Sequence, residues 1–218
     1  MPEVNVLRLI EIFASVQGES SLIGLPTTFV RLASCNLRCT WCDTPYSFGK
    51  GEPRSLEDIL NKVETLGLQA VCVTGGEPLL QEKVLDLMHT LCDLGYLVSL
   101  ETGGSLPIHK VDKRVKIILD LKCPGSGMVK KNLWDNIKEL KREDEVKFVI
   151  KDKTDYIWAK ERCEEFYLFD RCDTILFSPV HGLLDPKELV YWILEDKLPV
   201  RLNLQIHKYI WTPETKGV

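Results

Sequence analysis

The fold of this chain is decided by residues 28–44, which read TFVRLASCNLRCTWCDT. The first part is an unalternated apolar run, which is typical of a strand that is buried on both faces. The second part places Cys35, Cys39 and Cys42 in a C-x3-C-x2-C spacing directly after that strand. Clustered cysteines in a chain without a secretory signal indicate metal ligands or redox groups rather than disulfides. This stretch therefore predicts a metal or redox site at the end of a buried strand.

Further strands follow this stretch along the chain. Short apolar and β-branched runs predict them, and helical periodicity predicts helices between them. The predicted strands cover residues 28–33, 70–73, 97–100, 116–121, 146–150, 174–177 and 200–204. The apolar helix faces consist of Leu56, Ile59, Leu60 and Val63 in the first helix and of Leu80, Val84, Leu87, Met88 and Leu91 in the second. This alternation predicts right-handed βαβ units and a parallel sheet.

Helix start signals and polar loops complete the predicted architecture. Ser55 with Asp58 forms a capping box, and Asp185 with Pro186 marks another helix start. The polar loops that follow the strands are residues 35–42, 75–78, 101–104, 120–124, 178–179 and 205–207. Such loops gather on one rim, so we expect an α/β fold with mostly parallel strands, a partial or modified (β/α) TIM-type barrel. We expect a single domain over residues 1–218, because no linker divides it.

Composition excludes several classes of protein. The chain has 218 residues, a net charge of −4, 44% hydrophobic residues and 8 cysteines. The apolar content is too high for disorder, and the slightly acidic balance gives no support for a nucleic-acid partner. No apolar run reaches the roughly 18 residues that span a membrane. We expect a soluble cytoplasmic protein.

The three clustered thiols suit an iron-sulfur cluster. A structural zinc site usually has four ligands, and no second Cys pair or His pair is present. Three thiolates leave one iron of a cluster open to a substrate or cofactor. A zinc site or a redox-inert loop remains the alternative. Of the other cysteines, Cys72, Cys92, Cys163 and Cys172 are predicted as small core residues, and Cys123 lies on the rim.

Two features extend the cysteine motif. Trp41 precedes the last cysteine, and Thr74-Gly75-Gly76-Glu77-Pro78 follows the second predicted strand. With them the chain resembles the radical S-adenosylmethionine (radical SAM) superfamily. The resemblance implies a 4Fe-4S cluster whose open iron binds SAM, and cleavage of SAM to a 5'-deoxyadenosyl radical. It implies a cofactor site made of Trp41, Gly75, Gly76, Glu77, Ser99, Glu101, Asp120 and Lys122.

The glycine motif has a physical rationale of its own. Two glycines allow a backbone to approach a ligand closely, and the Glu77 carboxylate can accept hydrogen bonds from an ammonium group. Alone, the same motif is also typical of a plain strand-to-helix turn.

A narrower resemblance covers residues 10–211. It rests on Ser15-Val16-Gln17-Gly18-Glu19, on Phe29-Val30-Arg31-Leu32, on Asp43-Thr44 after the last cysteine, and on Gln205-Ile206-His207-Lys208. These segments together are similar to the 7-carboxy-7-deazaguanine synthase family. Members are lyases that convert 6-carboxy-5,6,7,8-tetrahydropterin to 7-carboxy-7-deazaguanine and ammonia, on the route to queuosine and other 7-deazapurines. The resemblance implies hydrogen abstraction from pterin C6, ring contraction, and return of the hydrogen to regenerate SAM.

The same resemblance assigns the substrate site. Its residues are Gln17, Glu19, Arg31, Thr74 and His207, with Thr44 as a Mg2+ ligand. Arg31 offers a forked donor for the pterin carboxylate, and His207 can handle a proton. The family also implies a homodimer and a flavodoxin-type electron donor. Residues 212–218 match the family poorly, although in it the C-terminal carboxylate, here on Val218, can reach the substrate.

Other interpretations remain open at this point. A glycyl-radical-enzyme activating enzyme shares the cluster spacing, and a non-catalytic iron-sulfur or zinc binding module is a second alternative. Arg31 can pair with a helix carboxylate, and Asp120 and Lys122 can form a plain ion pair. Gln17 and Glu19 can be solvated loop residues and His207 a structural histidine. We expect His89 and His109 to lie on the surface.

Overall fold

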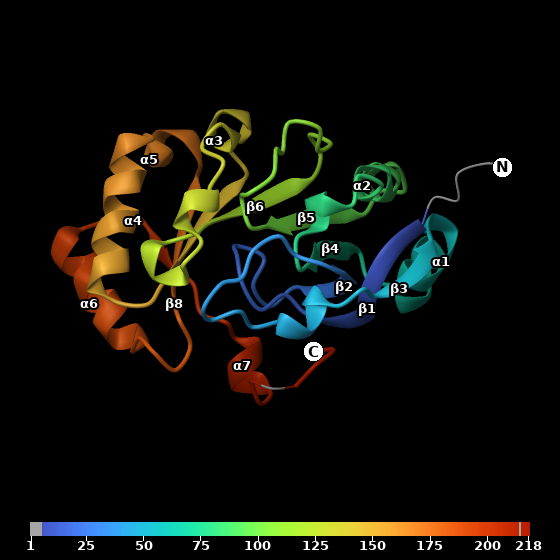
Figure 1. The fold of residues 1–218 in the computed structure, drawn as a ribbon, viewed down its shortest axis with the longest axis horizontal. Coiled ribbons are helices and arrows are strands. Elements are labelled where there is room, and N and C mark those ends of the chain that lie inside the picture. The colour runs from blue at the N-terminus through green and yellow to red at the C-terminus, as the bar shows by residue number, and fades with distance from the viewer. Residues whose placement is uncertain (1–5, 214) are drawn as a thin grey trace.

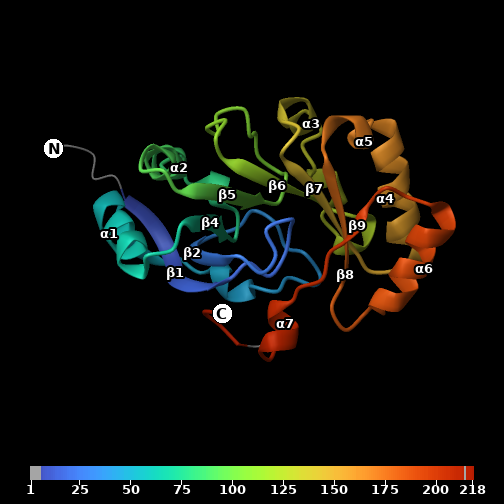
Figure 2. The same cartoon turned by 180° about the vertical axis from the view of Figure 1, so that it is seen from behind.

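A computed structural model describes residues 6–213 and 215–218. Within them the chain forms one nine-stranded sheet in the order β3-β1-β2-β4-β5-β6-β7-β8-β9, with helices outside it (Figures 1 and 2). The strands are β1 (Val6–Val16), β2 (Pro26–Leu32), β3 (Glu52–Ser55), β4 (Ala70–Gly75), β5 (Leu97–Thr102), β6 (Lys116–Leu121), β7 (Glu145–Ile150), β8 (Thr174–Pro179) and β9 (Arg201–Leu202).

Helices follow most of the parallel strands as expected, but the described residues between β5 and β6 contain no helix. The helices are α1 (Leu56–Leu66), α2 (Val84–Asp93), α3 (Asn136–Glu139), α4 (Lys153–Glu165), α5 (Leu168–Arg171), α6 (Pro186–Asp196) and α7 (His207–Ile210), with short 3-10 helices η1 (Pro45–Phe48), η2 (Pro78–Leu80), η3 (Pro124–Ser126) and η4 (Val129–Lys131). No helix in the described part of the chain is long and apolar enough to cross a membrane.

All seven predicted strands are present and pair in parallel from β2 to β9. The sheet does not close, so the predicted partial barrel with mostly parallel strands is confirmed. One expectation was wrong, because residues 28–33 do not form the first strand. β1 precedes β2 and pairs antiparallel with both β2 and β3. The sequence pattern misses β1 because this strand is only partly buried and carries charged residues among its apolar ones.

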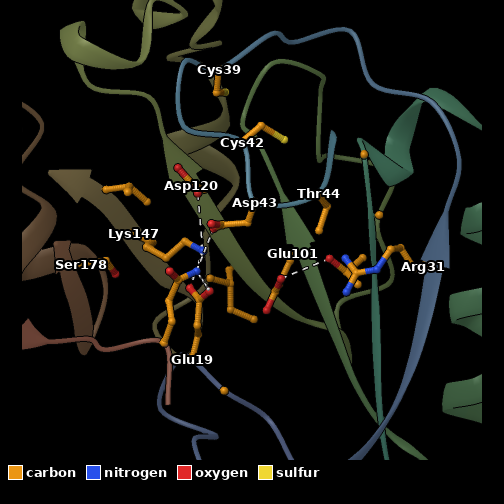
Figure 3. A pocket seen from close by; sticks show the side chains of 18 of the residues that line it. Glu19, Arg31, Cys39, Cys42, Asp43, Thr44, Glu101, Asp120, Lys147 and Ser178 are labelled. Carbon is orange, nitrogen blue, oxygen red and sulfur yellow. Dashed lines mark hydrogen bonds and ion pairs between the residues drawn. The ribbon is translucent and has the colours of Figure 1, made fainter. Parts of the chain in front are cut away.

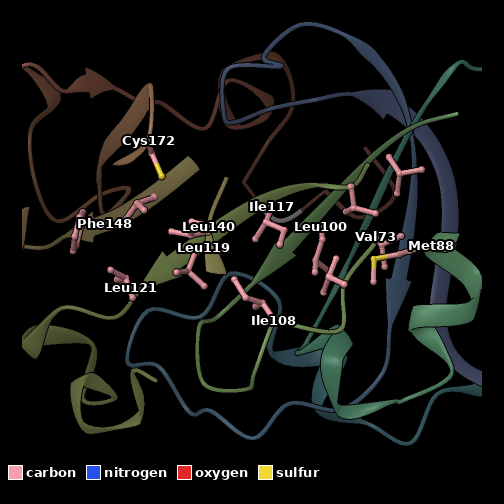
Figure 4. Close-up of a cluster of buried hydrophobic side chains, with 14 of the residues drawn as sticks. Val73, Met88, Leu100, Ile108, Ile117, Leu119, Leu121, Leu140, Phe148 and Cys172 are labelled. Carbon is pink, nitrogen blue, oxygen red and sulfur yellow. The ribbon is translucent and has the colours of Figure 1, made fainter. Parts of the chain in front are cut away.

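The buried strands have two chemically different faces. Val71, Val73, Phe148 and Ile150 belong to the hydrophobic core beneath the helices (Figure 4). Each such fully buried side chain contributes roughly 1.5–3 kcal/mol. The residues that alternate with them along the strands, such as Thr74 and Lys147, face the concave side, where a cavity lies. Because side chains alternate between the two faces of a strand, one face packs in the core and the other lines the cavity.

The predicted helix starts are confirmed. Ser55 and Asp58 form the capping box at the start of α1, and Asp185 accepts a hydrogen bond from the Lys187 N–H at the start of α6. The prediction of the second helix was wrong at Leu80, which lies in η2 and is 41% exposed. The short 3-10 helix begins at Pro78 and is capped at its end by Gln81. The helix α2 begins only at Val84.

Residues from the two ends of the chain meet across the concave side of the open sheet. The Ile206 N–H donates to the Gly18 carbonyl at 3.0 Å, and the Ser20 N–H donates to Asn203 Oδ1 at 2.8 Å. A Cβ on Gly18 would lie 2.1 Å from His207 Nδ1, so only glycine allows the imidazole to pack there. The loop after β1 and the segment after β9 therefore form one wall of the cavity.

Candidate functional site

The cavity lies at the carboxyl ends of the parallel strands, where α/β folds place their ligands (Figure 3). Most residues singled out from the sequence line it, although the chain spacing between them exceeds 180 residues. They are Gln17, Glu19, Arg31, Cys35, Cys39, Trp41, Cys42, Thr44, Thr74, Gly75, Gly76, Glu101, Asp120, Lys122 and His207. The predicted cofactor and substrate residues therefore share one cavity.

Two predicted cofactor residues do not line the cavity. Glu77 is fully buried, and its carboxylate accepts hydrogen bonds from Thr102 Oγ1 at 2.9 Å and from the Gly103 N–H at 2.8 Å. Burial raises its pKa. Ser99 pairs in register with Cys72, one step below Glu101 on the same face of β5. Glu77 thus braces the glycine loop against β5.

The two glycines allow one loop of this chain to approach another. The Gly76 N–H donates to the Leu32 carbonyl at 3.1 Å, and the Glu77 N–H donates to the Ser34 carbonyl at 2.9 Å. A Cβ on Gly76 would lie 2.1 Å from the Ser34 carbonyl oxygen. Larger residues would push the glycine loop away from the cysteine loop. The glycines therefore fix the base of the cysteine loop.

Cys35, Cys39 and Cys42 lie on the cavity in a half-buried loop. Burial raises the pKa of Cys35 and of Cys39, which favours the protonated thiols in the absence of a metal, and metal binding would release these protons. Among the described residues, no three His, Cys, Asp or Glu side chains gather closely enough to hold one metal ion. Each thiolate of a cubane binds a different iron. Sulfurs that are spread around a cavity therefore fit a 4Fe-4S cluster better than a single zinc ion.

The other cysteines behave as predicted. Cys72, Cys163 and Cys172 are buried, and Cys92 is partly buried against the core. Cys123, on the rim in sequence, is also buried in the core. His89 and His109 are exposed, and His89 pairs with Asp112 at 2.7 Å. None of these residues lines the cavity.

Arg31 is held by one edge of its guanidinium group. Its Nε donates to Glu11 Oε1 at 2.8 Å, and the Tyr46 hydroxyl donates to the same oxygen at 3.0 Å. The carboxylate partner therefore comes from strand β1 and not from a helix. Because the ion pair uses Nε, the two terminal nitrogens remain for a carboxylate ligand. The Phe13 ring, 5.8 Å from the guanidinium carbon, supports the same side chain.

Gln17 and Glu19 are not solvated loop residues. Gln17 is buried, and its Nε2 donates to Glu101 Oε1 at 3.4 Å. Thr74 Oγ1 donates to the other oxygen of Glu101 at 3.2 Å. Burial raises the pKa of Glu101. Glu19 is bound by Lys147 Nζ at 2.9 Å.

The pKa values of Glu19 and Lys147 are strongly shifted. Burial alone would raise the pKa of Glu19, but the Lys147 ammonium holds it at about 2. The pKa of Lys147 is raised, because Glu19 and Asp120 outweigh the burial that would lower it. Sequence reasoning missed Lys147. Its one signal is a lysine in the middle of the apolar strand Glu145-Val146-Lys147-Phe148-Val149-Ile150.

Asp120 and Lys122 form the expected ion pair and also line the cavity. Asp120 Oδ1 lies 3.0 Å from Lys122 Nζ, and its other oxygen lies 3.5 Å from Lys147 Nζ. The two interpretations of this pair are therefore compatible. Asp120 joins the cofactor side of the cavity to the substrate side.

The segment after β9 covers the cavity and is tied to the cysteine loop. Gln205 Nε2 donates to Glu19 Oε1 at 2.8 Å and to Asp43 Oδ2 at 2.9 Å, and Lys208 pairs with Asp43. Burial lowers the pKa of His207, so its imidazole is neutral at neutral pH. Val218 also lines the cavity. Asp43, Gln205 and Lys208 entered the sequence reasoning only as parts of motifs, without roles of their own.

Thr44 stands at the N-cap of η1 without a capping bond from its side chain. It lines the cavity next to the last cysteine of the loop (Figure 3). A hydroxyl is a hard oxygen ligand, and Mg2+ takes few protein ligands. The position therefore fits a magnesium ion that is also bound by substrate oxygens and water.

Comparisons with known proteins agree with this arrangement. Residues 30–125 match the radical SAM superfamily. The chain is 44% identical to the 7-carboxy-7-deazaguanine synthase of Koribacter versatilis, over 97% of this chain and 100% of that protein. It is also 44% identical to the synthase of Chlorobaculum tepidum, over 97% of each chain, and 37% identical to that of Methanospirillum hungatei, over 95% and 86%.

Solved structures show the same fold. The crystal structure of QueE from Escherichia coli aligns with a TM-score of 0.76 at 22% identity, covering 92% of this chain and 94% of that one. Streptococcus suis SuiB bound to its precursor peptide aligns with a TM-score of 0.55 at 15% identity, over 78% of this chain and 46% of that one.

Proposed function

The chain belongs to the 7-carboxy-7-deazaguanine synthase family of radical SAM enzymes, and from this premise we propose which residues carry out each part of the reaction. The protein is a lyase that converts 6-carboxy-5,6,7,8-tetrahydropterin to 7-carboxy-7-deazaguanine and ammonia, in the biosynthesis of queuosine and other 7-deazapurines. One observation supports the residue assignment above all others, namely that the predicted substrate residues and all predicted cofactor residues except Glu77 and Ser99 line a single cavity.

The cofactor end of the cavity holds the 4Fe-4S cluster on Cys35, Cys39 and Cys42. With SAM bound, the cluster would supply the radical that abstracts a hydrogen atom. Trp41 and Gly76 line this end, and Asp120 and Lys122 bind the polar groups of the cofactor. Gly75, with a Cβ position 2.3 Å from the Leu32 carbonyl oxygen, and Glu77 shape this end of the cavity.

The substrate end binds the pterin from two sides. The free edge of Arg31 binds the pterin carboxylate as a forked pair. Glu19 and Gln17 accept and donate hydrogen bonds at the pyrimidine edge, and Thr74 with Glu101 continues this polar wall. Phe13 and Phe29, stacked at 5.1 Å, give the cavity an apolar wall that excludes water from the reacting carbon.

Thr44 and His207 assist the later steps of the reaction. Thr44 would hold Mg2+, and the ion would supply stabilisation of negative charge on the substrate. His207 is neutral, so its imidazole can take a proton as ammonia leaves. Val218 also lines the wall of this cavity.

The remaining assignments concern partners and context. We infer that the whole chain acts as a single radical SAM domain in the cytoplasm, as a homodimer, and that a flavodoxin-type protein delivers the electron. Only the small-molecule pterin is required by the residues in the cavity.

Anaerobic reconstitution with iron and sulfide tests the proposal. With SAM, Mg2+ and a chemical reductant, the protein should release 7-carboxy-7-deazaguanine and equimolar ammonia from carboxytetrahydropterin. SAM should not be consumed in proportion to product. A fully loaded protein that cleaves SAM but leaves the pterin unchanged would contradict the substrate assignment, and colourless protein that binds zinc would contradict the cluster.

A further inference from the structure

A row of alternating charges runs through the wall of the cavity. Glu19 Oε2 lies 2.9 Å from Lys147 Nζ, which lies 3.5 Å from Asp120 Oδ2. The other oxygen of Asp120 lies 3.0 Å from Lys122 Nζ. Figure 3 shows Lys147 between Glu19 and Asp120. The row begins in the loop after β1, at the substrate end, and finishes after β6, at the cofactor end.

Lys147 occupies the centre of this row and has no other role in the proposed reaction. It projects from the middle of β7 into the cavity, and it is 7% exposed. A buried ammonium group is costly unless carboxylates compensate it. Two carboxylates contact Lys147 directly, and the Glu101 charge also acts on it. The opposite face of β7 packs in the hydrophobic core, so the strand cannot shift and the ammonium group has a fixed position.

We propose that Lys147 is a positioning residue that couples the two ends of the cavity, by holding Glu19 as an ionised acceptor toward the pterin and Asp120 toward the cofactor. The inference rests on the proposed function, because it takes Glu19 as a substrate contact and Asp120 as a cofactor contact. When a ligand orders one carboxylate, the shared ammonium orders the other. Binding of the pterin should therefore strengthen binding of SAM, and the reverse.

The groups around Glu19 determine what happens when Lys147 is removed. Lys147 faces it from β7, Asn203 and Gln205 from the segment after β9, and His207 from α7, while Glu101 acts from β5. Without the ammonium, burial and Glu101 both favour the protonated carboxyl. A protonated Glu19 loses an acceptor at the pyrimidine edge. The variant should therefore bind the pterin poorly at neutral pH and better as pH rises.

The experiment uses reconstituted full-length protein without a reductant, so that binding is measured without turnover. Dissociation constants for SAM and for carboxytetrahydropterin are measured separately and together, from about pH 6 to about pH 9. The variants are Lys147→Met, Glu19→Gln and the double variant Lys147→Met/Glu19→Gln. Lys151→Met is the matched control, because Lys151 is exposed just beyond the same strand.

In the wild type and in Lys151→Met, the pterin should tighten SAM binding by at least about 5-fold. In Lys147→Met this factor should fall to about one. The pterin affinity of Lys147→Met should also increase with pH by at least roughly 10-fold more than that of the double variant. The double variant lacks the titrating carboxyl, so it corrects for titration of the pterin and of His207. A merely structural lysine would change neither the coupling nor the pH profile.

Three results would overturn the inference while leaving the proposed function intact. They are a wild-type coupling factor of one, retained coupling in the double variant, and identical pH profiles for Lys147→Met and the double variant. If Lys147→Met does not fold, the double variant, which removes both opposite charges, carries the coupling test alone. Failure of the wild type to bind carboxytetrahydropterin at all would instead refute the proposed function.

Discussion

The cofactor end and the substrate end of the cavity are built in different ways. At the cofactor end, two consecutive loops contact each other through their backbones, as in the bond from the Gly76 N–H to the Leu32 carbonyl. At the substrate end, side chains from opposite ends of the chain meet, as in the bond between Gln205 and Glu19. The first end depends on shape and local motif. The second depends on charge and on long-range folding.

The largest expected effect lies at the cofactor end. Cys39→Ala removes one of three cluster ligands, so cleavage of SAM should fall below detection while the protein stays folded. Cys92→Ala, on α2 and away from the cavity, is the control and should retain full activity. Iron content and 5'-deoxyadenosine release measure the result. Cleavage by Cys39→Ala would show that this thiol is not a ligand.

Gly76→Ala tests whether shape alone defines that end. The added Cβ would meet the Ser34 carbonyl, so we expect a loss of about 1–3 kcal/mol in unfolding free energy and a low cluster yield. Gly49→Ala, whose Cβ would meet its nearest neighbour at 3.6 Å, should change neither quantity. Chemical denaturation and iron analysis measure the two quantities. Equal behaviour of the two variants would contradict the close-approach argument.

Arg31→Lys tests the substrate end with charge preserved. A lysine ammonium group cannot bind a carboxylate with two parallel hydrogen bonds as a guanidinium group can. The KM for the pterin should therefore rise about 10- to 100-fold with little change in cluster content. The exposed Arg54→Lys serves as the control. Steady-state kinetics measure the KM, and an unchanged KM for Arg31→Lys would contradict the proposed bidentate contact.

Thr44→Ala should abolish the stimulation of turnover by Mg2+ without loss of the cluster. Thr44→Ser keeps the hydroxyl and should keep most of the stimulation. Activity is measured across a magnesium titration. The same magnesium response in the alanine variant and in the wild type would exclude Thr44 as a ligand.

The smallest expected effect is a pH dependence at His207. Its pKa is lowered by burial in the folded state, so the unfolded state takes up the proton first as pH falls below about 6.5. Stability should therefore decline on acidification through that value and level off below the folded pKa. His207→Asn should lack this component in denaturation curves. A wild-type profile identical to that of the variant would show that the imidazole is not desolvated.

The sequence predicted most of the fold and of the cavity, and the errors have physical causes. β1 was missed because a partly buried strand with charged residues gives a weak pattern. The glycine motif does not reveal that Glu77 accepts hydrogen bonds from Thr102 and Gly103, because these residues come from another strand and its loop. Lys147 and Glu11 went unnoticed because a charged residue in a strand acquires meaning only from its partner across the sheet.

By itself, the sequence determined the buried strands, the helices between them and the cysteine and glycine motifs, because these depend on periodicity and on neighbours along the chain. The tertiary structure alone decided that Glu19 is ionised, that Arg31 presents its terminal nitrogens, and that His207 closes over Gly18. These properties depend on burial and on partners from other elements, such as Lys147 for Glu19, at a separation of 128 residues. The energy of a buried charge is set by its surroundings in space, which residue order does not specify.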